Sequence, residues 1–257
     1  MMKSVSQLNG STITATDGDI GHVKEVYFDD QGWAIRYLVV DTGSWLSGRE
    51  VLISPYAVTQ PLDAVKKVSV ALTRQQVENS PNIDTHQPIS RRHEREYLDY
   101  YAYPAYWGGD ALWAMSAMPL IPPTPLQTPL ETQAERARLD ENVLPEDAHL
   151  RSSENVSGYD IQATDDSIGH VQDFVFDDES WAIRYLVIDT RNWWPGGRKV
   201  LVGTHWIDRI DWADKTVFVK LTREQIKNSP QYEEGAPIDR AYEERLHDAY
   251  DRKGYWD

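Results

Sequence analysis

The sequence contains one long internal repeat, and this feature limits the possible folds more than any other. Asp17–Thr42 reads DGDIGHVKEVYFDDQGWAIRYLVVDT, and Asp165–Thr190 reads DDSIGHVQDFVFDDESWAIRYLVIDT, with most positions identical at a constant spacing. The match continues past one extra residue, Gly197, to Leu72–Val77 and Leu221–Ile226. A period this long does not suit a solenoid and indicates a duplicated domain of roughly 80 residues.

The repeat divides the chain into two copies, each followed by a tail rich in aromatic residues. The predicted divisions are copy 1 at residues 6–81, its tail at 82–107, a linker at 108–153, copy 2 at 154–230 and its tail at 231–257. The linker contains several prolines, which interrupt helices and strand ladders. One short helix, Leu130–Asn142, is nevertheless predicted there. A Tyr-Trp pair closes both tails, which predicts that the tails dock.

Most of each copy is predicted to be β-strand. Trp33–Val40 and its twin Trp181–Ile188 are rich in aromatic and β-branched residues, so each predicts a central, well-covered strand. The other strands predicted in copy 1, with twins in copy 2, are Thr12–Thr16, Ile20–Phe28, Glu50–Ser54, Ala57–Pro61 and Lys67–Leu72. Six short strands at this spacing predict a mainly β chain of two small antiparallel barrels.

Short helices are predicted to flank each barrel. Thr73 with Gln76, and Thr222 with Gln225, fit the capping-box pattern at a helix start. Both helices end before an Asn-Ser-Pro sequence, because the residue before proline avoids helical angles. The tails at 90–101 and 239–250 are also predicted to be helical.

The composition excludes several classes of protein. A formal charge of −15 argues against sequence-independent binding to nucleic acid and against docking on an anionic membrane surface. The absence of cysteine excludes disulfides and thiolate metal sites. No secretory signal is visible, and the most apolar window, residues 111–126, is too short for a membrane span of about 20 residues. We therefore expect a cytoplasmic protein without an integral membrane segment.

Each copy resembles the PRC-barrel domain over about residues 6–81 and 154–230. The resemblance rests on Ile-Gly-His-Val, the Asp-Asp turn, Ile-Arg-Tyr-Leu-Val-(Val/Ile)-Asp-Thr, Gly-Arg-x-Val-Leu, and Leu-Thr-x-x-x-(Val/Ile) before Ser-Pro. Such domains occur in the cytoplasmic part of the photosynthetic reaction-centre H subunit, in the ribosome-maturation factor RimM and in many small bacterial proteins. The resemblance implies an adaptor that binds protein partners, with no catalysis and no cofactor of its own.

Other functions stay open at this point. One is an accessory subunit of a photosynthetic or other electron-transfer complex, and another is an enzyme that uses the duplicated His and Asp residues. A ribosome-linked role is disfavoured by the acidic charge. Because the apolar strand pattern is kept in both copies while surface positions diverge, we expect the copies to pack as an intramolecular pseudo-dimer.

The duplicated histidines, His22 and His170, are the best candidates for chemistry. A histidine beside a carboxylate can act as a general base or bind a metal. The competing interpretation, which we favour, is that Gly-His-Val forms a tight turn in which the ring packs locally. No other histidine recurs at ligand spacing, so no metal site is predicted.

The duplicated carboxylates and arginines also have structural explanations. Calcium needs several converging oxygens, but the Asp-Asp pairs sit in turns and the third aspartate ends a strand. The aspartates are Asp29, Asp30, Asp41, Asp177, Asp178 and Asp189. Arg36 and Arg184 lie in the most apolar strands, where a buried guanidinium needs a carboxylate such as Asp41 or a strand neighbour.

Tryptophans in the glycine-containing loops are the predicted partner-binding residues. They are Trp45, Trp193 and Trp194. Tryptophan at a loop tip often marks a contact surface. The alternative is that the loop folds back over the open end of the barrel, and the sequence does not decide between the two.

Overall fold

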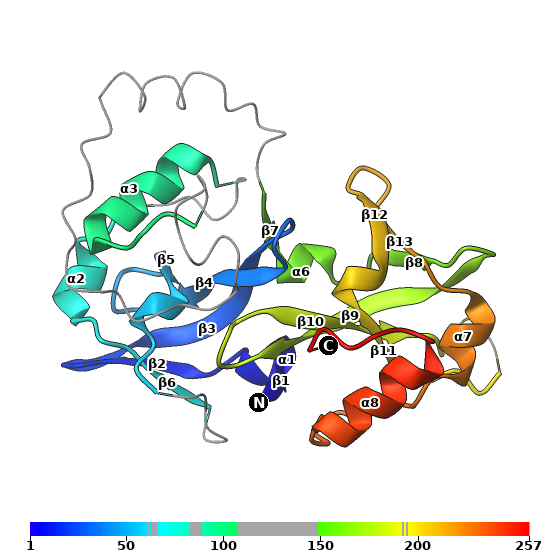
Figure 1. Cartoon of the computed structure of the whole chain (residues 1–257). Coiled ribbons are helices and arrows are strands. Elements are labelled where there is room, and N and C mark those ends of the chain that lie inside the picture. The colour runs from blue at the N-terminus through cyan, green and yellow to red at the C-terminus, as the bar shows by residue number, and fades with distance from the viewer. Residues whose placement is uncertain are drawn as a thin grey trace. The chain divides into compact units, whose positions relative to one another are not determined.

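Figure 1 shows a computed structural model of the chain, which describes residues 1–60, 62, 66–82, 89–106, 149–191, 193 and 195–256. The predicted helix Leu130–Asn142 and Trp194 lie outside the described residues. The chain divides into two compact units. We call Asn9–Ser152 the repeat-1 unit, and Met1–Leu8 with Ser153–Asp257 the repeat-2 unit.

Each unit is built on one sheet, and the mainly β prediction is confirmed. The repeat-1 sheet has the order β5 (Glu50–Ile53), β4 (Ala34–Asp41), β3 (Gly18–Asp29), β2 (Thr12–Ala15) and β6 (Lys67–Ser69). The repeat-2 sheet has the order β11 (Lys199–Gly203), β10 (Ile183–Asp189), β9 (Ser167–Asp177), β8 (Asp160–Gln162), β13 (Thr216–Val219) and β12 (Ile207–Asp211).

The sheets differ from an all-antiparallel barrel in one strand pair each. β2 pairs with β6 in parallel, and β8 pairs with β13 in parallel. Parallel neighbours need a crossover connection, and here the chain passes through three intervening strands before β6 returns beside β2. Among the described strands, the first and last members of each order do not pair with each other.

The predicted strand Ala57–Pro61 is reduced to one bridge. Pro55–Ala57 form a short 3-10 helix, η1, and only Val58 bridges to Val70. Its twin in repeat 2 is the full strand β12, which follows the 3-10 helix η3 (Thr204–Trp206).

The first strand of each repeat belongs to the other repeat's unit. β1 (Met2–Ser4) pairs antiparallel with β9, and β7 (Leu150–Ser152) pairs antiparallel with β3. The short helices α1 (Val5–Leu8) and α6 (Ser153–Val156) follow these strands. The units therefore depart from the sequence order of the repeats at residues 1–8, which fold with the second copy.

Trp33 and Trp181 lie in turns before the strands they were predicted to begin. Both have left-handed backbone angles, with φ of 49° and 59°. Trp33 stacks on Phe28 at 5.4 Å between ring centroids, and Trp181 stacks on Phe176 at 5.5 Å. The stacking offsets the cost of a left-handed conformation in a bulky residue.

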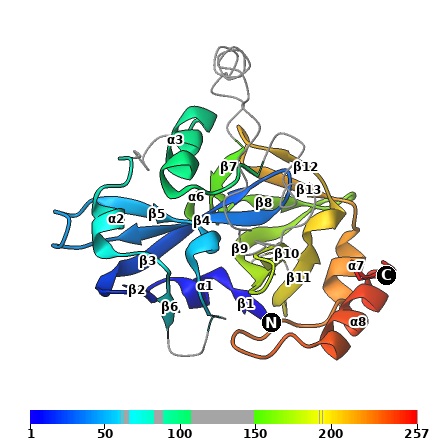
Figure 2. The same cartoon turned by 60° about the vertical axis from the view of Figure 1, so that its left-hand side comes forward.

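The predicted helices form and the tails dock on their own sheets. α2 (Arg74–Glu78) and α7 (Arg223–Asn228) begin with capping boxes at Thr73 and Thr222. The tails form α3 (Arg91–Tyr101) and α8 (Arg240–Ala249). In Figures 1 and 2, α3 lies over β4 and β5, and its Tyr97 and Leu98 join a buried cluster with Tyr37, Val39 and Leu52.

Candidate functional site

The Ile-Gly-His motif is a site of close backbone approach between strands. A Cβ atom on Gly21 would lie 2.0 Å from the carbonyl oxygen of Asp41, and one on Gly169 would lie 2.5 Å from that of Asp189. Only glycine fits such an approach. The glycine is therefore needed to pair β3 with β4 and β9 with β10.

The histidines beside these glycines have local contacts. His22 Nδ1 lies 3.4 Å from the hydroxyl of Thr12, and the His170 ring packs edge-on against Trp193 at 6.4 Å. The described residues contain no group of three or more His, Asp or Glu side chains able to hold a metal. This geometry supports the local-packing interpretation of His22 and His170.

The duplicated aspartates bind neighbouring groups. Asp30 accepts a hydrogen bond from Arg151 at 2.7 Å, and Asp41 accepts one from the Gly43 amide at 2.8 Å. Asp178 has a charged partner too, the amino group of Met1. Asp189 binds Arg191, which lowers the pKa of its carboxyl below the usual value. These contacts agree with the structural interpretation of the aspartates.

The buried arginine of repeat 1 has a strand neighbour as its partner, one of the two alternatives considered. Arg36 donates a hydrogen bond to Asp29 at 2.9 Å, and both side chains are buried. Gly32 makes room for this pair, because a Cβ there would lie 3.1 Å from Asp29 Oδ2 and 3.2 Å from Arg36 Nη2.

Repeat 2 carries serine at the position of that glycine. The Ser180 hydroxyl donates to Asp177 at 2.8 Å, so it binds the aspartate equivalent to Asp29. Arg184 instead lies over the ring of Tyr255 at 4.3 Å. Arg36 also lies over the equivalent ring, Tyr106, at 4.1 Å. The contact between the arginine and the tail tyrosine is thus shared by both repeats, while the ion pair is particular to repeat 1.

A carboxyl group of the tail helix α3, that of Glu94, is buried against the repeat-1 core. Glu94 is 1% exposed and accepts hydrogen bonds from the hydroxyls of Tyr37 at 3.2 Å and Tyr106 at 2.5 Å. Arg91, one turn earlier, donates to its other oxygen at 3.2 Å. Burial raises the pKa of Glu94 to about 7 and raises those of both tyrosines well above their usual value.

Repeat 2 contains the same arrangement around Glu243. Tyr185 and Tyr255 donate to this carboxylate at 2.8 Å and 2.9 Å, and Arg240 lies 3.5 Å away. Burial, with the hydrogen bond to Glu243, raises the pKa of Tyr255 to about 12. We call each set of one glutamate, two tyrosines and one arginine a tail latch, because it joins the tyrosine near the end of the tail to a tyrosine of the sheet through the glutamate.

Sequence reasoning missed the two glutamates. Each lies in a strongly charged helix that reads as solvent-exposed. The available signal was the repeated Arg-x-x-Glu of Arg91–Glu94 and Arg240–Glu243, together with the repeated tyrosine of the tail. In both repeats the Arg-x-x-Glu motif lies at the same distance before the tail tyrosine. This repeated spacing indicates that the glutamate and the tyrosine contact each other in both repeats.

Repeat 2 adds two histidines beside its tail latch. His247 Nε2 lies 3.1 Å from the hydroxyl of Tyr185, and its ring stacks with His205 at 5.8 Å. Burial and the neighbouring His247 lower the pKa of His205 to about 4. His205 is therefore neutral at pH 7, which favours its stacking on His247.

The loop tryptophans fold back on their own units. The guanidinium of Arg74 lies over the ring of Trp45 at 4.4 Å, and Trp193 Nε1 donates to the Ser167 hydroxyl at 3.2 Å. Both rings are partly buried. The structure thus favours the fold-back alternative for these two loops, and their role in partner binding stays a prediction.

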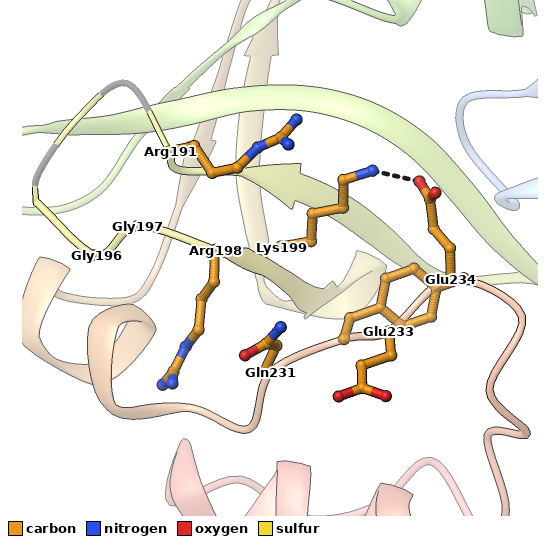
Figure 3. Close-up of a pocket in the computed structure, with 9 residues that line it drawn as sticks. Arg191, Gly196, Gly197, Arg198, Lys199, Gln231, Glu233 and Glu234 are labelled. Carbon is orange, nitrogen blue, oxygen red and sulfur yellow. Dashed lines mark hydrogen bonds and ion pairs between the residues drawn. The ribbon is translucent and has the colours of Figure 1, made fainter.

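A shallow pocket opens at the base of the loop that carries Trp193. Its volume is about 420 Å³, and its lining comes from the loop and from the segment after α7. Figure 3 shows Lys199 and Glu234 pointing toward one another across it, joined by an ion pair. Arg191, whose side chain is 60% exposed, lies on the loop side, and Glu233 lies on the opposite side. The pocket therefore offers both charges to a ligand.

The fold and these sites define a tandem β protein whose buried polar groups bind its own tails. The sequence profile of the PRC-barrel domain matches residues 1–72 and 150–226, more than half of the chain. The chain therefore belongs to the PRC-barrel domain family, and the suspected resemblance is confirmed. No curated protein matches it. In the part of the chain that is described, no helix is long and apolar enough to cross a membrane.

Proposed function

We propose that this chain is a non-catalytic adaptor of the cytoplasm that binds protein partners through its duplicated PRC-barrel copies, which act as an intramolecular pair. The family membership is compatible with a binding role. The observation that carries the proposal is the pocket at the base of the Trp193 loop, since it is a solvent-facing site next to a residue predicted to bind a partner.

The pocket suits a protein surface better than a small metabolite. It is open and shallow, and its charged side chains Lys199 and Glu234 are already paired with one another. A partner that brings its own charged side chains can exchange with such a surface pair at little cost, because exposed ion pairs contribute only about 0–1 kcal/mol. Charges at the rim of an interface also steer association and select partners.

The non-catalytic part of the proposal is supported by the duplicated polar residues. A catalytic base must reach a substrate proton. Glu94 and Glu243 are buried residues of the tail helices α3 and α8, where each accepts hydrogen bonds from two tyrosines. Asp29 is likewise buried and bound to Arg36. These groups serve to hold the fold together.

The test is capture of partners by the tagged full chain from lysate of the source cells after chemical crosslinking, with identification by mass spectrometry. The variant Arg191→Glu with Lys199→Glu reverses two of the cations of the pocket. The control is Arg92→Glu, on the exposed face of α3. We expect the pocket variant to capture at least tenfold less partner than the native chain, and the control to capture the same amount as the native chain. Both variants should have the melting temperature of the native chain.

The outcomes separate the candidate functions. Equal capture by the pocket variant would exclude the pocket as the binding surface. No capture above a tag-only control would contradict the adaptor function. Recovery of pigment-binding or electron-transfer subunits, lost with the pocket variant, would identify the accessory-subunit role as the form the adaptor takes.

A further inference from the structure

Each long central strand is covered along only half of its edge by strands of its own repeat. In repeat 2, β8 pairs with Ser167–His170 of β9, which leaves the end at Val175–Asp177. In repeat 1, β2 covers β3 from Gly18 to His22. An uncovered strand edge is a docking site for another strand.

In both units the uncovered half is filled by the first strand of the other repeat. Ser4 lies opposite Val175 in the repeat-2 unit. Ser152 lies opposite Tyr27 in the repeat-1 unit. The profile match begins at residues 1 and 150, so the exchanged strands are the first segments of each PRC-barrel copy.

The two dockings use equivalent contacts. The amide of Asp178 donates to the carbonyl of Met1 at 3.0 Å, and the amide of Asp30 donates to the carbonyl of His149 at 2.9 Å. A basic side chain of each exchanged strand then faces the same aspartate. Arg151 binds Asp30 at 2.7 Å, and Lys3 lies 4.0 Å from Asp178.

A second polar contact is also repeated at the inner end of each exchanged strand. The Ser152 hydroxyl donates to the buried carboxylate of Glu25. In the other unit, the equivalent carboxylate, Asp173, accepts a hydrogen bond from the Ser6 amide at 3.2 Å. Burial raises the pKa of Asp173. Asp173 also accepts a hydrogen bond from the Phe174 amide at 2.8 Å, so the exchanged segment supplies one of its donors and β9 another.

We propose that this reciprocal strand exchange is the interaction that holds the two repeats together, so that residues 107–148 are not needed for their association. The docking surface is the uncovered half of β3 and of β9, and its occupant is the first strand of the other repeat in the same chain. The proposal deepens the pairing of copies proposed above. It does not depend on the capture of a partner, so either can fail alone.

Engineered disulfides test which strand occupies each edge. The amide of Asp178 bonds to Met1, so the alternation of an antiparallel ladder makes Ser4 and Val175 a non-hydrogen-bonded pair, with Cα atoms about 4.5 Å apart. That spacing suits a disulfide, and the native chain has no cysteine to compete. Ser4→Cys with Val175→Cys, and Ser152→Cys with Tyr27→Cys, report the exchange.

The matched control for the disulfides is Ser4→Cys with Tyr27→Cys, the pair expected if each first strand stayed in its own repeat. We expect both exchanged pairs to oxidise to disulfides within one chain, and the control to stay reduced. Oxidation of the control, failure of the exchanged pairs to oxidise, or covalent dimers of two chains would each overturn the proposal.

Cleavage of the linker tests whether the exchange is sufficient to hold the repeats. A specific protease site is inserted after Thr124 in the full chain, and the cut protein is analysed by size-exclusion chromatography at micromolar concentration. We expect the two pieces to elute together. Separation of the unmodified cut pieces would overturn the proposal.

Proline substitutions give the matched comparison in the cut protein. Lys3 and Arg151 fall on hydrogen-bonded pairs of the two ladders, so proline there removes a ladder bond. Lys3→Pro with Arg151→Pro is expected to raise the dissociation constant of the two pieces at least tenfold. Lys3→Ala with Arg151→Ala keeps the backbone bonds and is expected to keep the pieces together. Equal behaviour of the two variants would contradict the role of the ladders.

Discussion

Tyr97 and Tyr250 donate hydrogen bonds to equivalent carbonyl oxygens from positions one helical turn apart in the aligned repeats. Tyr97 bonds to Leu52 and Tyr250 to Leu201, each at 3.0 Å. Both tyrosines are fully buried. The repeats have therefore kept a phenol at this carbonyl while moving the residue that supplies it.

Removing the two hydroxyls should have unequal effects. Tyr97 also accepts a hydrogen bond from the Ser54 amide at 3.1 Å, so Tyr97→Phe leaves two buried backbone groups without this partner. We expect Tyr97→Phe to lower the free energy of unfolding by about 2–3 kcal/mol and Tyr250→Phe by about 1 kcal/mol. Urea titration followed by circular dichroism measures both. Equal losses would mean that the Ser54 bond contributes nothing.

The buried carboxylate of repeat 1 should make stability fall as the pH rises. The pKa of Glu94 is about 7 in the folded chain, against 4.5 for an unperturbed glutamate. Between these values the folded state holds a proton that the unfolded state has released. Stability therefore decreases from about pH 4.5 to pH 7, by about 3 kcal/mol in total.

The variant Glu94→Gln isolates this contribution, because an amide does not titrate in this range. The free energy of unfolding in urea is compared at pH 5 and pH 8 for the native chain and the variant. The decrease in this free energy that is attributed to Glu94 should be absent in the variant. Glu96→Gln, a half-exposed carboxylate on the same helix, is the control. An unchanged pH dependence in Glu94→Gln would contradict the assignment.

The difference between Gly32 in the β3–β4 turn and Ser180 in the β9–β10 turn should determine whether the buried arginine can pair. In Gly32→Ser, the new hydroxyl competes for Asp29 as Ser180 does for Asp177, and the Cβ crowds Arg36. We expect Gly32→Ser to lower the free energy of unfolding by about 1–3 kcal/mol. The reverse change, Ser180→Gly, removes one hydrogen bond and should cost about 1 kcal/mol. Thermal melting of both variants checks this order.

The Ile-Gly-His motif should depend on its glycine far more than on its histidine. Gly21→Ala places a methyl group against the Asp41 carbonyl and should destabilise the chain by more than about 2 kcal/mol. His22→Ala loses one long contact to Thr12 and should change stability by less than about 0.5 kcal/mol. A large loss of stability in His22→Ala, measured by the same urea titration, would contradict this order and show that the ring contributes to packing beyond its contact with Thr12.

The sequence was sufficient for the parts of the fold that depend on local patterns. The strand that contains Arg36, the capping boxes at Thr73 and Thr222, and the docking of the tails all followed from residue types at fixed spacing. Strand direction did not follow. A short run such as Lys67–Ser69 has the same alternation whether its neighbour is parallel or antiparallel.

The strand exchange was beyond local reasoning for a different reason. Met2–Ser4 and Leu150–Ser152 are similar short segments, and the two edges that they fill are similar as well. Each segment therefore fits either edge by composition. Residue types alone therefore do not show which edge each segment fills. The same limit applies to the tail latches, where a buried Glu94 looks like any charged helical residue until its tyrosines are placed.

The exchange also fixes an order of events during synthesis. β1 is made about 170 residues before the part of β9 that it pairs with, as the register of Ser4 with Val175 requires. At roughly 5–20 residues per second, that interval lasts on the order of ten to thirty seconds. Throughout it the strand that β1 pairs with in the folded chain is absent, and Lys3 at the centre of β1 places a charge on a segment that could otherwise pair with neighbouring nascent chains. A sequence change in β1 would accordingly affect the association of nascent chains before it affects the stability of the folded protein.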